Sequence, residues 1–137
     1  MLDYALVMDG RELEALVSAR LAADANVAVV YLFGSRARGT SRAASDLDVG
    51  VLYRTAPPAT LLGQPFELQT ALASELRLPV DIVVMNTAPV DLVHRILHDG
   101  RILLERDRSR RIAFEVKARN EYFDLLPILQ RYRRRSA

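Results

Sequence analysis

The feature that most constrains the fold is a continuous run of apolar residues, Val27–Phe33, which follows Asn26 and ends directly at Gly34. Seven residues are too few for a buried helix, and most of their side chains are β-branched or aromatic. The run therefore predicts a strand that is buried on both faces. Two further short runs, Asp46–Tyr53 and Val80–Met85, predict two more strands.

Segments with helical periodicity separate the predicted strands. Residues 10–24 carry apolar side chains at helical spacing, and Asp9 with Glu12 has the spacing of a capping box. We expect further helices over 66–77, over 88–98 and from about 107 onward, the last capped by Asp107 or Ser109 and kinked at Pro127, and a short strand over 101–105. Strands that alternate with helices indicate an α+β or α/β domain whose sheet is flanked by helices.

The length and composition indicate the class of protein. A chain of 137 residues fits one domain, 1–137, because most domains contain about 100–200 residues. The absence of cysteine excludes disulfides and thiolate zinc sites. No apolar stretch approaches the ~20 residues that span a bilayer, and the N-terminus, with Asp3 and Asp9, lacks a basic leader. We therefore expect a cytoplasmic protein with no membrane contact.

The formal net charge of +2 is unevenly distributed. Residues 1–105 contain 9 Arg and 13 Asp or Glu, whereas residues 106–137 contain 10 Lys or Arg and 4 Asp or Glu. Such a basic end can meet RNA, a triphosphate or an acidic protein surface. A solvated helix face in an arginine-rich protein would have the same composition, so direct nucleic-acid binding stays open.

A candidate phosphate-binding turn follows the first predicted strand. The glycine at the strand end, Gly34, lets a phosphate approach the backbone closely because no Cβ intervenes. The next residues should begin a short helix or turn whose amides favour an anion. Ser35 adds a hydroxyl donor, and Arg36 and Arg38 add positive charge. Taken alone, this segment also fits a plain turn.

Three carboxylates are the candidate metal ligands. Asp46 and Asp48 are separated by one residue, so both should emerge on one face of their strand. Two adjacent carboxylates repel each other, and burying them is costly. A bound divalent cation would offset both effects. The simpler alternative is an Asp-x-Asp on the protein surface. Asp81 interrupts an apolar strand, where a solvent-exposed strand end would also explain it. If the two strands pair, the three acids converge as two-metal phosphoryl transfer requires.

These motifs resemble those of a known family. Gly34-Ser35, ten residues, then Asp46-Leu47-Asp48 is similar to the Gly-Ser…Asp-x-Asp signature of the DNA polymerase β-like nucleotidyltransferase superfamily, and Asp81 stands where that family has its third carboxylate. The short chain resembles the minimal nucleotidyltransferases, in particular the MntA-type antitoxins of HEPN/MNT toxin–antitoxin pairs. Val80–Asn86 and Arg119–Pro127 share the resemblance. It implies a polymerase β-like fold with a small mixed sheet.

The resemblance also implies a function. It implies an enzyme that transfers AMP from ATP to a tyrosine of a HEPN ribonuclease partner and so silences it. Two alternatives stay open: an aminoglycoside-type enzyme that modifies a small molecule, and a toxin-binding module without catalysis. The first would need an acceptor pocket that a chain of this length does not supply alone.

Residue roles follow from the same resemblance. Asp46 and Asp48 would hold two Mg²⁺ ions, and Asp81 would complete the site of the ion that activates the acceptor hydroxyl. The residues that would hold the triphosphate are Gly34 and Ser35, assisted by Arg36 or Arg38.

Other chemistry-bearing side chains receive simpler interpretations. His94 and His98 share one helical face, but the sequence offers no third nearby ligand, so we interpret them as surface histidines rather than a zinc site. Tyr122, Phe123 and Tyr132 recur at helical spacing and are expected to be core or partner contacts rather than a base-stacking platform.

Overall fold

A computed structural model describes residues 9–39, 45–58 and 64–136. The elements follow one another in the order α2 (Gly10–Ala22), β1 (Val27–Phe33), α3 (Ser35–Arg38), β2 (Leu47–Tyr53), α4 (Gln64–Leu76), β3 (Val80–Val84), α5 (Val90–Asp99), β4 (Arg101–Glu105) and α6 (Arg108–Ser136). The expectation that no leader is present concerns residues 1–8, which lie outside the described part. In that part, no helix combines the length and the apolar character needed to cross a membrane.

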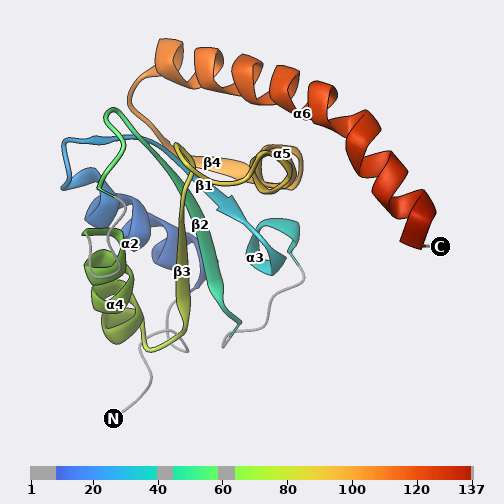
Figure 1. Cartoon of the computed structure of the whole chain (residues 1–137). Helices are drawn as coiled ribbons and strands as arrows, with labels where there is room; N and C mark the ends of the chain where they lie inside the picture. The colour runs from blue at the N-terminus through green and yellow to red at the C-terminus, as the bar shows by residue number, and fades with distance from the viewer. Residues whose placement is uncertain (1–8, 40–44, 59–63, 137) are drawn as a thin grey trace.

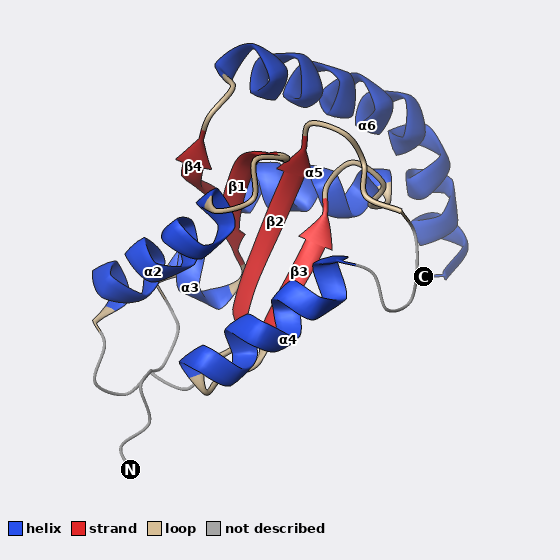
Figure 2. Ribbon diagram, turned by 90° about the vertical axis from the view of Figure 1, so that its left-hand side faces the viewer, coloured by secondary structure: helices blue, strands red, loops and turns tan. Residues whose placement is uncertain are grey.

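The strands form one sheet in the order β3-β2-β1-β4 (Figures 1 and 2). β1 runs antiparallel to β2 and β4, whereas β2 and β3 are parallel. A parallel pair needs a crossover connection, and α4 lies in it. β1 has strands on both sides and helices on both faces, so all of its residues are buried. This architecture confirms the predicted α+β class with a small mixed sheet flanked by helices.

Helices cover both faces of the sheet (Figures 1 and 2). Buried side chains form a separate core on each face. On one face, Leu13 and Val17 of α2 and Leu72 of α4 pack against residues of β1 and β2. On the other face, Val93 and Ile96 of α5 pack, together with α6, against the remaining residues of β1. Because side chains alternate along a strand, the position of each strand residue decides which core it joins.

Two glycines let α5 lie close to the sheet. A Cβ on Gly50 of β2 would lie 2.8 Å from Sδ of Met85 and 3.4 Å from a methyl group of Ile96 on α5. A Cβ on Gly100, which follows α5, would lie 2.7 Å from the carbonyl oxygen of Leu32 on β1. These close approaches place the C-terminal end of α5 beside the end of β1.

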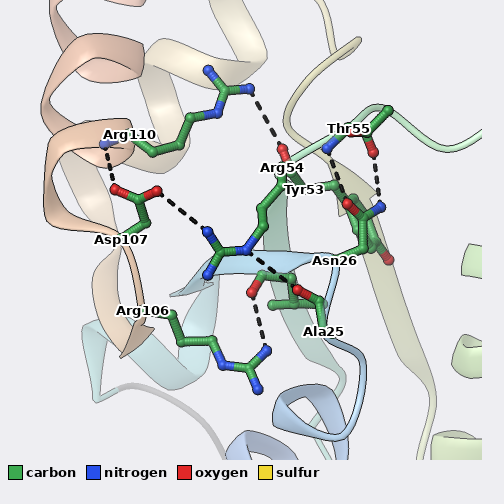
Figure 3. A network of polar contacts seen from close by, with 9 residues as sticks. Ala25, Asn26, Tyr53, Arg54, Thr55, Arg106, Asp107 and Arg110 are labelled. Atoms are coloured by element: carbon green, nitrogen blue, oxygen red, sulfur yellow. Dashed lines mark hydrogen bonds and ion pairs between the residues drawn. The ribbon is translucent and has the colours of Figure 1, made fainter.

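The start of α6 is held by a hydrogen-bonded junction (Figure 3). Oδ1 of Asp107 accepts a hydrogen bond of 2.9 Å from the backbone N–H of Arg110, so Asp107 rather than Ser109 caps the helix. Oδ2 of Asp107 pairs with Arg54 at 3.3 Å. Arg106 donates to the backbone of the turn between α2 and β1. The junction therefore ties α6 to the end of β2 and to the start of β1.

Most predicted boundaries agree with the structure within two residues. α2 ends two residues earlier than expected, α4 begins two residues earlier and α5 begins two residues later. β2 begins at Leu47, so Asp46 precedes the strand, and β3 ends at Val84. Asp9 accepts from the backbone N–H of Glu12 at 2.8 Å, which is one of the two capping-box bonds. Pro127 lies inside α6, whose axis bends in its C-terminal half (Figure 1).

Tyr53, the last residue of β2, gives a test of the core. Its side chain is fully buried, and its hydroxyl has no hydrogen-bond partner among the described residues. A buried hydroxyl without a partner loses hydration and gains nothing in return. We expect Tyr53→Phe to leave the free energy of unfolding unchanged or to raise it by about 1 kcal/mol in urea denaturation. If Tyr53→Phe instead lowers the free energy of unfolding by about 1 kcal/mol, the hydroxyl is hydrogen-bonded in solution.

Candidate active site

Three carboxylates meet at the end of the sheet where β2 and β3 begin. The parallel register pairs Asp48 of β2 directly with Asp81 of β3, and the antiparallel register places Phe33 of β1 opposite Asp48. Asp46 stands two residues before Asp48, the spacing that puts side chains on one side of an extended chain. Asp48 is half-buried, while Asp46 and Asp81 are exposed. The two strands do pair, which was the condition for the acids to converge, and their register places Asp48 beside Asp81.

The surroundings of Asp48 disfavour its negative charge. Burial raises the pKa of Asp48 above its ordinary value, and the neighbouring carboxylates of Asp81 and Asp46 raise it further. Arg38 and Arg95 act in the opposite direction without cancelling these effects. A carboxylate that is partly dehydrated and faces two others is in an environment that a bound cation would stabilise.

Gly34 brings the main chain against Asp48. Its φ of 74° lies in the left-handed region, which a residue with a Cβ rarely adopts. A Cβ at this position would collide with Oδ2 of Asp48. α3 starts at the next residue and ends at Arg38, and the residue that caps its C-terminus, Gly39, also has a positive φ of 72°. The turn after β1 is thus built so that the backbone passes close to a carboxylate.

The two arginines of α3 lie in different places. Arg36 donates to the carbonyl oxygen of Ser45 from Nη2 at 2.7 Å and from Nε at 3.2 Å, and burial lowers the pKa of its guanidinium. It therefore holds the segment just before Asp46 against α3. Arg38 instead lines the cleft above the carboxylates.

The cleft has a volume of about 330 Å³. The described residues that line it are Phe33, Gly34, Arg38, Asp48, Asp81, Arg95 and Asp99. In the described part of the chain, the guanidinium groups of Arg38 and Arg95 make no hydrogen bond or ion pair. Arg20, Arg101 and Arg111, by contrast, form ion pairs elsewhere on the chain. Two arginines without such bonds, on different walls of a cleft, suit an anionic ligand with several oxygens.

Sequence reasoning missed Arg95 and Asp99. Both lie on α5, one helical turn apart, and reach the cleft because α5 packs against the end of β1. No local motif marks either residue. The sequence offers one indication, which is that the two residues are spaced i, i+4 on the helix after the third predicted strand. This spacing points to the cleft only when the position of α5 is known.

The two histidines interpreted as surface residues have other partners. His94 stacks on Tyr122, with ring centroids 3.5 Å apart and planes inclined by 2°, and Nδ1 of His98 pairs with Oδ1 of Asp99 at 2.8 Å. In the described part of the chain, no three His, Cys, Asp or Glu side chains are arranged as they stand to hold a metal ion. Phe123 is 57% exposed and Tyr132 69% exposed, so neither belongs to the core.

Known proteins share this fold. Residues 17–109 match the family model described as polymerase beta, nucleotidyltransferase. No curated protein is detectably similar to the chain in sequence. A chain in a crystal structure of a toxin–antitoxin with AMP-PNP is 28% identical, with a TM-score of 0.77 over 87% of this chain and 94% of that chain.

Two further structures extend the comparison. A tri-AMPylated Shewanella oneidensis HEPN toxin in complex with MNT antitoxin contains a chain of the same fold, 24% identical, with a TM-score of 0.75 over 90% of this chain and 95% of that chain. A candidate minimal nucleotidyltransferase is 34% identical, with a TM-score of 0.55 over 69% of this chain and 96% of that chain.

The matched region includes the whole of the carboxylate site. The turn at Gly34, the paired strands that carry Asp48 and Asp81, and the arginine-lined wall of α5 all lie between residues 17 and 109. That region is more than half of the chain. The chain therefore belongs to the polymerase beta family of nucleotidyltransferases.

Proposed function

We propose that this protein is an antitoxin that transfers AMP from ATP to a tyrosine of a partner HEPN ribonuclease and thereby neutralises it. The observation that carries the proposal is the pairing of Asp48 with Asp81 beside Gly34, which places two carboxylates and a close approach of the main chain in one cleft. The comparisons support it, because similar chains occur in a toxin–antitoxin structure with AMP-PNP and beside an AMPylated HEPN toxin.

The carboxylates at the sheet end fit magnesium. Mg²⁺ prefers oxygen ligands and is usually held by one or two carboxylates together with substrate phosphates. Asp46 and Asp48 would hold two ions, and Asp81 would complete one of the two sites. The repulsion that raises the pKa of Asp48 is the kind that bound cations relieve. When bound, the ions supply neutralisation of the triphosphate charge and a lower pKa for the acceptor hydroxyl.

The proposed reaction is an in-line transfer of AMP. The acceptor tyrosine oxygen forms a bond to the α-phosphorus of ATP, while the bond from that phosphorus to the bridging oxygen of the β-phosphate breaks and pyrophosphate leaves. The hydroxyl proton passes to the carboxylate of Asp81, which is exposed in the cleft. Gly34 lets the triphosphate lie against the main chain beside Asp48, with Ser35 as an additional donor. Holding the acceptor hydroxyl and ATP in this geometry contributes to the rate acceleration.

Arg38 of α3 and Arg95 of α5 are expected to bind the triphosphate in the cleft. We predict that Arg38→Ala and Arg95→Ala each raise the KM for ATP about tenfold, a loss of ~1.4 kcal/mol, because a charge-assisted hydrogen bond to phosphate is lost. The matched control is Arg20→Ala, since Arg20 pairs with Glu75 on the opposite face of the sheet. Steady-state kinetics would measure the effect, and an unchanged KM in both cleft variants would contradict it.

The proposal is tested by a transfer assay. Purified protein would be incubated with Mg²⁺, α-labelled ATP and the protein encoded by the neighbouring reading frame, which is expected to be helical and to carry an Arg-x4-His motif. Label on that protein supports the proposal. Label on an aminoglycoside offered in parallel would identify a small-molecule enzyme instead. A toxin that is neutralised without any transfer would identify a binding module.

A further inference from the structure

The longest element of the fold extends beyond the core that it covers. α6 has 29 residues and packs on α5 and β1. Its first half supplies the buried Ala118 and the partly buried Phe114 to the core beneath α5. Beyond Leu129 every described side chain of the helix is exposed. Figure 1 shows this end of α6 running past α5 and away from the sheet.

The exposed end of α6 has one face that combines apolar and cationic side chains. Ile128, Arg131, Tyr132 and Arg135 are spaced i, i+3, i+4 and i+7, so they lie along one side of the helix beyond the bend at Pro127. Ile128 is 49% exposed and Tyr132 69% exposed. We call these four residues the distal face of α6.

The charge of this segment is one-sided. Residues 125–137 contain four arginines and no acidic residue. Earlier in α6, by contrast, positive charges have acidic neighbours, as in the pairs of Arg111 with Glu115 and of Lys117 with Glu121. A helix end with little tertiary packing gains little stability from its own hydrogen bonds. On this one, the exposed side chains of Ile128 and Tyr132 lie one helical turn apart and are neighbours on the helix surface.

Nearly all of α6 lies outside the region that the family model matches. The family model ends at residue 109, just after α6 begins at Arg108. Residues 1–107 are about 78% of the 137, so a match over 87% of this chain to the toxin–antitoxin structure with AMP-PNP must include part of α6. The match to the candidate minimal nucleotidyltransferase, over 69% of this chain, does not require it.

We infer that the distal face of α6 is the docking surface for the protein that accepts AMP, and that it inserts into an acidic groove with an apolar floor on that partner. The inference rests on the proposed function and names the surface that holds the acceptor. Tyr and Arg side chains are enriched at the energetic centres of protein interfaces, and a helix that presents anchors at i, i+3, i+4 and i+7 suits a groove. The apolar Ile128 among the arginines favours a protein over a nucleic-acid backbone.

The test separates docking from chemistry. Binding of the HEPN protein encoded beside this chain is measured by calorimetry without ATP, so the result does not depend on catalysis. We expect Arg131→Ala and Tyr132→Ala each to weaken the Kd at least tenfold. Arg133→Ala is the matched control, because successive helical residues are about 100° apart and Arg133 points away from the distal face. It removes the same charge from the same helix end and should leave the Kd within about twofold.

A second readout excludes a merely structural role. In the transfer assay, Tyr132→Ala should raise the KM for the acceptor while kcat at saturating acceptor stays within about twofold of wild type. Circular dichroism should show unchanged helix content, since the substituted side chain is exposed. The matched aromatic control is Phe123→Ala. Phe123 is also exposed, and it lies on another face of α6, because successive helical residues are about 100° apart.

Three outcomes would overturn the inference. Binding that Arg133→Ala weakens as much as Arg131→Ala would show a general charge effect. Binding unaffected by Tyr132→Ala would exclude the distal face. Tight binding of a single-stranded RNA oligonucleotide that is lost in Tyr132→Ala, with HEPN binding intact, would assign the face to RNA. If the HEPN protein binds through this face but receives no AMP, the proposed function fails while the docking surface stands.

Discussion

Asp48→Asn is expected to abolish AMP transfer, with kcat lower by at least ~10³-fold, because it removes the half-buried carboxylate on which the other two acids converge. Single-turnover transfer from labelled ATP would measure the loss. The matched control is Glu67→Gln, an exposed carboxylate of α4 on the opposite side of the sheet. An Asp48→Asn variant that transfers AMP at the wild-type rate would contradict the assignment.

Asp48→Asn should lower activity but raise the stability of the fold. A loss of activity in this variant would therefore not be explained by misfolding. Burial and the neighbouring carboxylates raise the pKa of Asp48, so the folded state is most stable when this group is protonated, and it loses that stability as pH rises through the folded pKa. At neutral pH without divalent ions, Asp48→Asn should therefore unfold at a slightly higher temperature than wild type. Added Mg²⁺ should stabilise the wild type more than the variant.

Gly34→Ala is expected to have the second largest effect. The added Cβ would collide with Oδ2 of Asp48 and would occupy a left-handed conformation at φ 74°. We expect transfer activity, as kcat/KM, to fall about 100-fold because the carboxylate is displaced from its place in the cleft. The strained backbone should lower the free energy of unfolding by about 1–2 kcal/mol.

Gly39 provides a matched control for this substitution. It has nearly the same positive φ, 72°, but a Cβ there would meet nothing within 4 Å. Gly39→Ala should therefore show a similar loss of stability with activity close to that of wild type. Equal losses of activity in the two variants would mean that backbone strain in α3, rather than the contact with Asp48, explains the effect.

The sequence predicts the sheet well because its strands have strong local signals. Val27–Phe33 is apolar throughout, since β1 lies between two strands and two helical layers. The pairing of β3 with β2 stood only as a condition for the acids to converge, and the register of the sheet meets it by pairing Asp81 with Asp48. No local pattern in the sequence predicts that β4 pairs with β1, because this pairing depends on the position of α5, which precedes β4.

The site is predictable only where its residues form local motifs. Gly34 and the acids of β2 belong to short patterns, whereas Arg95 and Asp99 reach the cleft through the packing of α5. That packing depends on close contacts at Gly50 and Gly100, which the sequence does not distinguish from other glycines. The sequence also could not separate the cleft-lining Arg38 from Arg36, whose guanidinium is bonded to the carbonyl of Ser45.

The most direct test of the central claim is the intact mass of the protein encoded by the neighbouring reading frame, which the proposed function expects to be a HEPN protein, after co-expression with this chain. We expect a mass increase equal to a whole number of AMP units, located on a tyrosine by peptide mapping, with wild-type protein and none with Asp48→Asn. A HEPN protein that is neutralised in cells by the wild-type chain but keeps its unmodified mass would contradict the account.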